Sequence, residues 1–357
     1  MSAVRPPDPA GPVPLVVVGA GLIGRRHVAA IQESPHARLV AVVDPDPAAA
    51  PLADAAGVPL HATLDELLSK QETTGAGVVV ATPNDLHLPH GLSCLAAGLP
   101  VLVEKPIAGS VADGLALVEA AEAAGVPLLV GHHRRHSPLL AAAAEVVGSG
   151  RLGPVVAVQG SALFYKPDDY FDVAPWRREP GGGPILINLV HEVDDLRAIC
   201  GDVVAVQAMA SSHVRGFAVE DTVAVTMRFA SGALGTFLLS DAAASARSWE
   251  QTSGENPAYP LSPDEDCYLI AGTGGSLAVP SLRMRSYAGT LSWWEPWETA
   301  VVPVERRDPL RTQLEHFCDV VRGRAAPLVS GRDAVETLRV TLAVAEAART
   351  GGLIDTR

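Results

Sequence analysis

Short apolar runs alternate with longer amphipathic stretches over residues 14–131. The apolar runs occupy 15–19, 39–44, 77–81, 100–104 and 127–131, and the alanine-rich amphipathic stretches occupy 22–33, 64–70, 86–97 and 111–123. Continuous apolar runs of this length are typical of strands buried on both faces. Their alternation with helices predicts an α/β domain with a doubly wound parallel sheet over 14–131. The proline-rich segment 1–13, which lacks an apolar signal segment, is expected to be a flexible leader.

The pattern changes after residue 131. Strand-like runs lie at 155–164, 203–211, 221–230, 235–240, 267–272 and 275–280, and helix-like stretches lie at 138–147, 184–200, 309–322 and 333–350. Ser-Gly and Gly-Gly pairs separate the strand-like runs, as in antiparallel sheets. We predict a second, α+β domain over 132–357, built on a mostly antiparallel, open-faced sheet. Two domains also suit a chain of 357 residues.

Composition narrows the class of partner. The formal net charge of −13 argues against nucleic acid or an anionic membrane as the main partner. No apolar run approaches the ~20 residues that a membrane-spanning helix needs. The four cysteines, at 94, 200, 267 and 318, are scattered without a Cys-x-x-Cys pair. This usage is typical of reduced thiols, so we expect a cytoplasmic protein without a disulfide frame or zinc site.

A glycine-rich turn follows the first apolar run. Gly19, Gly21 and Gly24 have the GxGxxG spacing, with Leu22 and Ile23 between them, at a strand-to-helix junction. Such glycines let a pyrophosphate approach the backbone and the helix N-terminus, so we expect all five residues to contact a dinucleotide. Packing glycines are the alternative.

The second apolar run ends in Asp44, which is placed to accept hydrogen bonds from an adenosine ribose. No Lys or Arg follows within 45–51 to neutralise a 2′-phosphate. The sequence therefore favours NAD, with NADP less favoured; a helix-capping role for Asp44 is the alternative.

Four further motifs occur in a fixed order: ATPNDLH at 81–87, EKP at 104–106, GHHRRHSP at 131–138 and GGGPILINLVHEVD at 181–194. With the glycine turn, they resemble the Gfo/Idh/MocA oxidoreductases, a family that includes glucose–fructose oxidoreductase and inositol dehydrogenase. The resemblance covers nearly the whole chain and implies a Rossmann domain followed by an α+β domain. It also implies cofactor contacts from Thr82, Pro83, Asn84, His87, Glu104 and Lys105.

Lys105 lies at the carboxyl end of a predicted parallel strand, where open α/β sheets gather ligands. An ammonium there can donate to a substrate oxygen and stabilise a developing alkoxide. His191 lies in the predicted helix 184–200, and an imidazole is a natural acceptor for a hydroxyl proton. The resemblance implies catalytic roles for both residues. A solvated lysine and a structural histidine are the alternatives.

The chain departs from the family pattern one turn before His191. Inositol-dehydrogenase-like members have an Asp there, whereas this chain has Ile187. Asn188 can position a hydroxyl but cannot take its proton. Either His191 acts with Lys105 alone, or Asp194 orients it, or the chemistry or the substrate differs. We assign Asn188 and Asp194 to substrate binding.

Other candidates are weaker. One of Arg134 and Arg135 is expected to touch substrate or cofactor while the other forms ion pairs, and we favour Arg134 for substrate. Trp176 and Arg177 could supply a sugar-stacking ring and a hydroxyl-binding guanidinium, with packing as the alternative. His132, His133 and His136 have no matching carboxylate or cysteine set, so we expect no metal site. The polar segment 248–266 suits a lid or an interface arm.

These observations lead to one functional hypothesis. We expect an NAD-dependent dehydrogenase acting on a secondary alcohol of a sugar, polyol or related cyclic compound. The alternatives are an NAD-using glycosidase, a non-catalytic dinucleotide or sugar sensor, and a reductase of a non-sugar carbonyl or tetrapyrrole. The open face of the second sheet predicts a homodimer or homotetramer.

Overall fold

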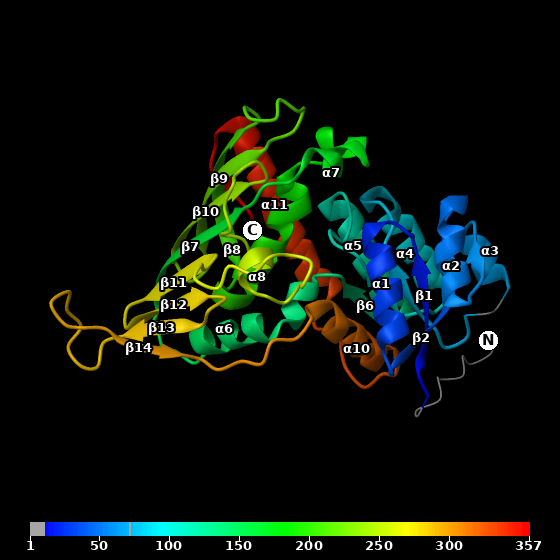
Figure 1. Ribbon diagram of the computed structural model, residues 1–357, viewed down its shortest axis with the longest axis horizontal. Helices are drawn as coiled ribbons and strands as arrows, with labels where there is room; N and C mark the ends of the chain where they lie inside the picture. The colour runs from blue at the N-terminus through cyan, green and yellow to red at the C-terminus, as the bar shows by residue number, and fades with distance from the viewer. Residues whose placement is uncertain (1–10, 71–72) are drawn as a thin grey trace. The chain divides into compact units, whose positions relative to one another are not determined.

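The computed structural model describes residues 11–70 and 73–357, so the first ten residues of the expected leader lie outside the described residues. Contacts divide the chain into two units (Figure 1). One comprises Met1–His133 and Pro309–Leu338, and the other comprises Arg134–Asp308 and Arg339–Arg357. Each unit has its own sheet, and the prediction of one parallel and one mostly antiparallel sheet is confirmed.

Six parallel strands form the sheet of the first unit, in the order β3-β2-β1-β4-β5-β6. They are β1 (Val13–Val18), β2 (Ala37–Val43), β3 (Leu60–His61), β4 (Gly77–Val80), β5 (Val101–Val103) and β6 (Leu128–Val130). Every residue of β1, β4, β5 and β6 is buried, which explains their unbroken apolar sequences. The order reverses between β1 and β4, and α/β sheets bind ligands at such a switch point.

Helices follow the strands of this unit. They are α1 (Leu22–Glu33), α2 (Ala50–Ala56), α3 (Leu64–Ser69), α4 (His87–Ala96) and α5 (Val111–Ala124), with 3₁₀ turns η1 (Pro47–Ala49) and η2 (Asn84–Leu86). The hydroxyls of Thr63 and Ser110 cap α3 and α5 by accepting from the backbone three residues on. The sequence pattern missed α2 and β3. Both are short, and a seven-residue helix is too short to show a clear apolar period.

The expected boundary of the second domain needs one correction. Residues 309–357 were assigned to that domain, but the contacts group Pro309–Leu338 with the first unit. Helix α10 (Pro309–Val321) packs on α1, β2 and β4. Its Phe317 is fully buried, beside Gly77 of β4. An apolar helix face predicts burial but does not name the sheet that it covers, so the pattern could not show this return.

Nine strands form the sheet of the second unit, in the order β14-β13-β12-β11-β7-β10-β9-β8-β15. They are β7 (Val155–Leu163), β8 (Val203–Ser211), β9 (Thr222–Phe229), β10 (Leu234–Ser240), β11 (Tyr268–Gly272), β12 (Gly275–Val279), β13 (Arg283–Ser286), β14 (Glu298–Val301) and β15 (Ile354–Asp355). Only the central β7–β10 pair is parallel. The pattern missed β13, β14 and β15, which are two to four residues long and rich in charged or exposed residues.

One face of this sheet carries the core of the second unit. Alternate residues of β9 and β10 are buried, and they pack with residues of the helices into one apolar cluster. The helical elements are η3 (His133–His136), α6 (Pro138–Gly148), α7 (Asp168–Asp172), η4 (Pro175–Arg178), η5 (Ile185–Leu189), α8 (Val190–Cys200), α9 (Trp249–Thr252) and the part of α11 (Gly331–Thr350) from Arg339 onward. Among the described residues, no helix is both long and apolar enough to cross a bilayer.

The packing of α10 in the first unit can be tested by opening a cavity. Phe317→Ala should lower the free energy of unfolding by about 3–5 kcal/mol, because it removes a fully buried ring. Leu328→Ala, at a half-exposed position of the same unit, should change it by no more than about 0.5 kcal/mol. Urea unfolding of both variants measures the difference. Equal stability of the two variants would contradict the assignment of α10.

Candidate active site

The residues expected to contact a cofactor lie at one edge of the parallel sheet. The strands β2, β1, β4 and β5 are neighbours and run the same way, so their carboxyl ends meet at that edge. The residues that follow these ends include Asp44, Gly19, Thr82 and Lys105. The structure thus brings together, within the first unit, all the residues expected to contact the dinucleotide.

The glycine turn is shaped by close backbone contacts. Gly19 has a φ of +97°, and a Cβ on it would lie 2.6 Å from the carbonyl oxygen of Ala81. A Cβ on Gly24 would lie 1.9 Å from the carbonyl oxygen of Gly19. Gly21 faces open space, because a Cβ there would have no neighbour within 4 Å. Two glycines therefore allow the turn to form, and the third leaves room beside its backbone.

The start of α1 leaves backbone N–H groups for a ligand. The helix begins at Leu22 with Gly21 as its N-cap, and no side chain caps it. Its first turn contains no acidic residue, so the unpaired N–H groups and the helix dipole favour an anion there. Leu22 is 73% exposed. A diphosphate fits this combination of open backbone, free donors and an uncovered apolar side chain.

Asp44 is oriented by the backbone. Ala20 N donates to its Oδ2 at 2.6 Å, and Asp46 N donates to its Oδ1 at 2.9 Å. Each carboxylate oxygen has two acceptor positions, so each can still accept from a ribose hydroxyl. The carboxylate therefore fits a diol better than a 2′-phosphate, because a phosphate is also negatively charged and would be repelled.

Thr82 and His87 belong to the turn after β4. His87 is buried, and its Nδ1 and Nε2 lie 2.8 Å from the carbonyl oxygen of Pro106 and 2.9 Å from that of Thr82. Burial lowers the pKa of His87 despite these two carbonyls. The imidazole thus joins the Thr82 and Pro106 loops. Its expected part in cofactor binding is therefore to hold Thr82 in place.

Glu104 and Lys105 follow β5, and the Lys105–Pro106 peptide bond is cis. Glu104 is buried and lies 2.7 Å from His27 Nε2, while its Oε2 accepts from Lys105 N at 3.2 Å. Burial raises the pKa of Glu104, but the hydrogen bond and charge of His27, with His133 and Lys105, outweigh it and lower the pKa to about 2. This ionised carboxylate anchors the backbone of Lys105.

The residues expected to bind substrate all belong to the second unit. A π-helical segment, η5, precedes α8, and such segments often occur at functional sites. Asn188 is in η5, and His191 and Asp194 follow on α8 at three-residue intervals. His191 and Asp194 are buried, and Arg135 Nη1 lies 3.4 Å from Asp194 Oδ1. Ile187, which directly precedes Asn188 in the chain, is partly buried.

Sequence reasoning missed two polar residues at the ends of the parallel pair β7 and β10. Lys166 Nζ donates to Asn188 Oδ1 at 2.7 Å and lies 3.2 Å from Asp241 Oδ2. Because β7 and β10 are parallel neighbours, the residues after their ends are brought together. The sequence signal for this pair is a charged residue soon after each of the two apolar runs that form β7 and β10. A mostly antiparallel sheet was predicted, and in an antiparallel pair these two ends would lie apart, so the sequence did not suggest that Lys166 and Asp241 meet.

Aromatic rings and an arginine surround this lysine. Lys166 Nζ lies 5.0 Å from the centre of the Tyr170 ring, and the guanidinium carbon of Arg177 lies 3.8 Å from the same ring centre. Trp176 is half exposed, and the Arg177 guanidinium is 5.7 Å from its ring centre. Trp176, Arg177 and Asn188, all expected to bind substrate, thus belong to one polar and aromatic cluster with Lys166.

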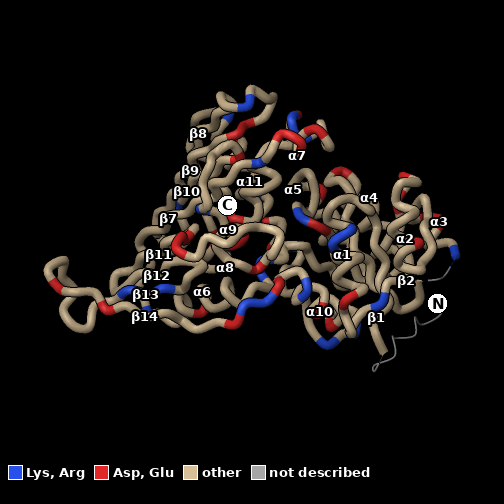
Figure 2. The backbone as a smooth tube through the Cα atoms, in the orientation of Figure 1, with Lys and Arg blue, Asp and Glu red and all other residues tan. Residues whose placement is uncertain are grey.

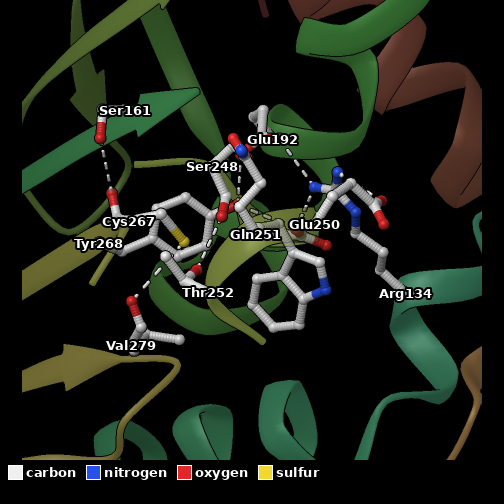
Figure 3. A network of polar contacts seen from close by, with 12 residues as sticks. Arg134, Ser161, Glu192, Ser248, Glu250, Gln251, Thr252, Cys267, Tyr268 and Val279 are labelled. Atoms are coloured by element: carbon white, nitrogen blue, oxygen red, sulfur yellow. Dashed lines mark hydrogen bonds and ion pairs between the residues drawn. The ribbon is translucent and has the colours of Figure 1, made fainter. Parts of the chain in front are cut away.

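Arg134 has a different position from the one expected (Figure 3). Its guanidinium is buried and lies 2.7 Å from Glu192, 3.1 Å from Asp195 and 3.2 Å from Glu250. Tyr268 donates to Glu192 and lies 3.0 Å from Asp195. The prediction that Arg134 binds substrate is corrected, because three carboxylates occupy its terminal nitrogens. Arg134 instead holds α8 against the second unit.

Protonation balances this buried cluster. Burial raises the pKa of Asp195, and the charges of Glu192 and Asp194 add to this effect, while Arg134 opposes it. The phenol of Tyr268 has one hydrogen for two carboxylates, so a proton on Asp195 relieves their repulsion. Arg134 supplies the positive charge that balances the remaining carboxylate charge of the cluster.

The segment 248–266 also differs in part from expectation. Trp249, Thr252 and Glu255 are buried, and Ser137 Oγ donates to Glu255 at 2.5 Å. Its first half is therefore part of the core of the second unit, and is not a lid. Within 11–70 and 73–357, no group of three or more His, Cys, Asp or Glu side chains is arranged to hold a metal.

Family models match both halves of the chain. Residues 13–132 match the model described as "Oxidoreductase family, NAD-binding Rossmann fold", and residues 140–278 match the "GFO/IDH/MocA C-terminal domain". The chain belongs to the Gfo/Idh/MocA oxidoreductase family. The chain is therefore an NAD(P)-binding oxidoreductase.

Several Gfo/Idh/MocA proteins are similar along most of their length. The 1,5-anhydro-D-fructose reductase of Ensifer adhaerens is 31% identical over 77% of this chain and 78% of its own. The rhizopine catabolism protein MocA of Rhizobium meliloti is 28% identical over 93% and 94%. The solved structure of the WlbA dehydrogenase of Chromobacterium violaceum, in complex with NADH and UDP-GlcNAcA, is 27% identical, covers 99% of both chains and has a TM-score of 0.78.

Removing the buried cation should destabilise the protein. Arg134→Met leaves Glu192 and Asp195 without their cation, and should lower the free energy of unfolding by about 3–5 kcal/mol. Arg332→Met breaks the exposed pair with Glu122 and should cause little change. Thermal and urea unfolding compare the two variants. If Arg134→Met were as stable as Arg332→Met, the structural role of Arg134 would be wrong.

Proposed function

We propose that the protein is an NAD-linked dehydrogenase of a secondary alcohol on a sugar, polyol or related cyclic compound. The observation that carries this proposal is that the chain keeps Lys105, anchored through Glu104 at the end of β5, together with the buried His191 on α8. These are the two residues that the family resemblance implies for catalysis. The names of similar proteins, which include inositol 2-dehydrogenase and D-apiose dehydrogenase, support this class of substrate.

Bound NAD supplies a hydride acceptor, and its reduced form supplies a hydride donor. The backbone of the glycine turn and the N-terminus of α1 would hold its diphosphate, and Asp44 its adenosine ribose. The ionised carboxylate of Asp44 has hydrogen-bond acceptors and no donor, so we expect it to bind the hydroxyls of a ribose diol rather than a 2′-phosphate. NAD is therefore the proposed cofactor.

The chain's own side chains would manage the proton and the charge. Lys105 donates a hydrogen bond to the reacting hydroxyl oxygen and stabilises the negative charge that develops as the C–H bond breaks. His191 accepts the hydroxyl proton, and it returns a proton to the oxygen in the reverse direction. Ile187 contributes no proton acceptor, so in this proposal His191 is the only general base on its helix turn.

The essential role of Lys105 can be measured directly. Lys105→Met removes the ammonium but keeps most of the side-chain volume, so turnover should fall by roughly a thousandfold or more on any sugar or polyol that the wild type oxidises. Lys70→Met removes an exposed lysine paired with Glu66 and should leave turnover unchanged. NADH absorbance follows both reactions. Full activity in Lys105→Met would refute the mechanism.

The proposed assembly is a homodimer or homotetramer formed through the second sheet. The face of this sheet opposite the core exposes apolar side chains, including Met209, Leu234, Leu238 and Leu269. The β13–β14 hairpin at the sheet edge adds exposed Trp293. Pairing of two copies would cover this surface.

Light scattering after size exclusion tests this assembly. The wild type should have at least twice the mass of a 37.0 kDa chain. Leu269→Arg places a charge in the middle of the exposed face and should shift the protein toward a monomer, whereas Leu328→Arg, at an exposed position of the first unit, should not. A monomeric wild type would contradict the proposal.

The proposed location is the cytoplasm. All four cysteines are free, and Cys94, Cys267 and Cys318 are buried. Burial raises the pKa of Cys94 to about 12, which keeps it an unreactive thiol. Unpaired thiols of this kind suit a reducing compartment.

The charged residues, which are interspersed in both units, form no continuous basic stripe along the described tube (Figure 2).

A further inference from the structure

Lysine is very rare in this chain. Of 27 cationic side chains only 3 are lysines, Lys70, Lys105 and Lys166, and the others are arginines. Lys70 is exposed and Lys105 is the proposed catalytic residue. A chain that otherwise uses arginine has kept a lysine at 166. The lysine ammonium is more compact than the arginine guanidinium and loses its proton more readily. We therefore expect position 166 to use one of these two properties.

Lys166 is buried at the junction of three elements. It follows β7, and its Nζ contacts Asn188 Oδ1 in η5 and Asp241 Oδ2 after β10. Its backbone is also fixed, because Lys166 N donates to the Asp241 carbonyl at 2.8 Å and Arg215 Nη2 donates to the Lys166 carbonyl at 2.8 Å. A side chain held this firmly can define the geometry of its partner.

The contact determines which way the Asn188 amide faces. An ammonium has three donors and no acceptor, so the amide oxygen must face Lys166. The amide NH₂ must then face away from Lys166. No described residue accepts a hydrogen bond from this NH₂. Asn188 is partly exposed and one helical turn before His191, so its NH₂ is a donor available to a substrate.

Further donors lie around the same point. Lys166 has one N–H beyond those directed at Asn188 and Asp241. Arg177 uses Nη1 to bind the Tyr170 carbonyl, and its Nε has no hydrogen-bond partner among the described residues. The nearby carboxylate Asp241 already accepts from Lys166 and Arg215. The cluster therefore offers donors and positive charge, and the negative charge of Asp241 is balanced by these two cations.

We propose that Lys166 is a positioning residue that fixes Asn188 as a hydrogen-bond donor, and that Lys166, Asn188 and Arg177 form a subsite for a carboxylate group of the substrate. This inference rests on the proposed dehydrogenase function and narrows its substrates to sugar acids, such as uronic or aldonic acids. Position 187, where the resemblance implies an Asp, carries an uncharged Ile in this chain, so it adds no negative charge that would oppose a carboxylate.

The charge of Lys166 depends on pH in a useful range. Burial lowers the pKa of Lys166 to about 8, Asp241 opposes this shift, and Arg177 and Arg215 add to it. Glu220, near the start of η5, and the Tyr170 phenol are further titratable groups of the cluster, and Asp168 lies 3.8 Å from Nη1 of Arg215. The ammonium is present below about pH 8 and is lost as the pH rises through that value. Preference for the acid should therefore weaken above pH 8.

The first test compares D-glucuronate with D-glucose and D-galacturonate with D-galactose, which differ in one carboxylate. The ratio of kcat/KM for the acid to that for the neutral sugar should be roughly ten or more in the wild type at pH 7. The gain should lie in KM. A ratio of one or less overturns the inference.

Variants separate positioning from charge. Lys166→Met and Asn188→Asp should each bring the ratio close to one, the first by releasing the amide and the second by replacing it with a carboxylate. Lys166→Arg keeps the charge but replaces the compact ammonium with a planar fork, so it should also lose most of the preference. Retention of the full preference in Lys166→Arg would show that charge alone acts, and would overturn the positioning role. Lys70→Met is the matched control.

A spectroscopic readout works even if none of these sugars is turned over. Protein labelled with carbon-13 at the lysine side chains has only three lysine signals, which Lys70→Met and Lys166→Met assign. With NAD bound, D-glucuronate or D-galacturonate should shift the Lys166 signal while the neutral sugars should not. No shift with either acid overturns the inference.

The two proposals fail in different ways. Activity in Lys105→Met refutes the dehydrogenase mechanism whatever the sugar preference. An inactive Lys105→Met, together with unchanged acid preference in Lys166→Met and Asn188→Asp, leaves the dehydrogenase intact and refutes the carboxylate subsite.

Discussion

The contact between Arg134 and the carboxylates of α8 is the interaction on which the position of α8 in the second unit depends. Glu192 and Asp195 lie on the same helix as His191, and both are buried against one guanidinium. Charges removed from water are tolerated only when they are paired, so these ion pairs fix the position of α8 in the second unit. The position of the helix in turn fixes where its other polar residues lie. Tyr268 of β11 extends the same network to the sheet.

Both units use the ends of parallel strands to collect polar groups. In the first unit four such ends bring the glycine turn, Asp44, Thr82 and Lys105 to one edge. The second sheet is antiparallel except for β7 and β10, and the charged pair Lys166 and Asp241 follows the ends of those two strands. Side chains distant in sequence thus become neighbours wherever two strands share a direction.

Much of this arrangement follows from the sequence. The apolar runs and the GxGxxG turn predict the first sheet and its cofactor edge, because a strand buried on both faces and a tight turn each leave a local signature. Helix α1 has the predicted bounds, Leu22–Glu33. The role of Arg134 could not be predicted, since its partners at 192, 195 and 250 are distant in the chain. The parallel pairing of β7 with β10, and with it the role of Lys166, is likewise a non-local property.

The return of α10 to the first unit has a consequence for synthesis on the ribosome. Most of the second unit, Arg134–Asp308, lies inside the sequence of the first, between His133 and Pro309. Until α10 has been translated, the surface beside α1 and Gly77 lacks the helix that covers it. That apolar surface stays open to water until almost the whole chain has been translated. The first unit can therefore be completed only after residues 134–308 of the second unit have been made.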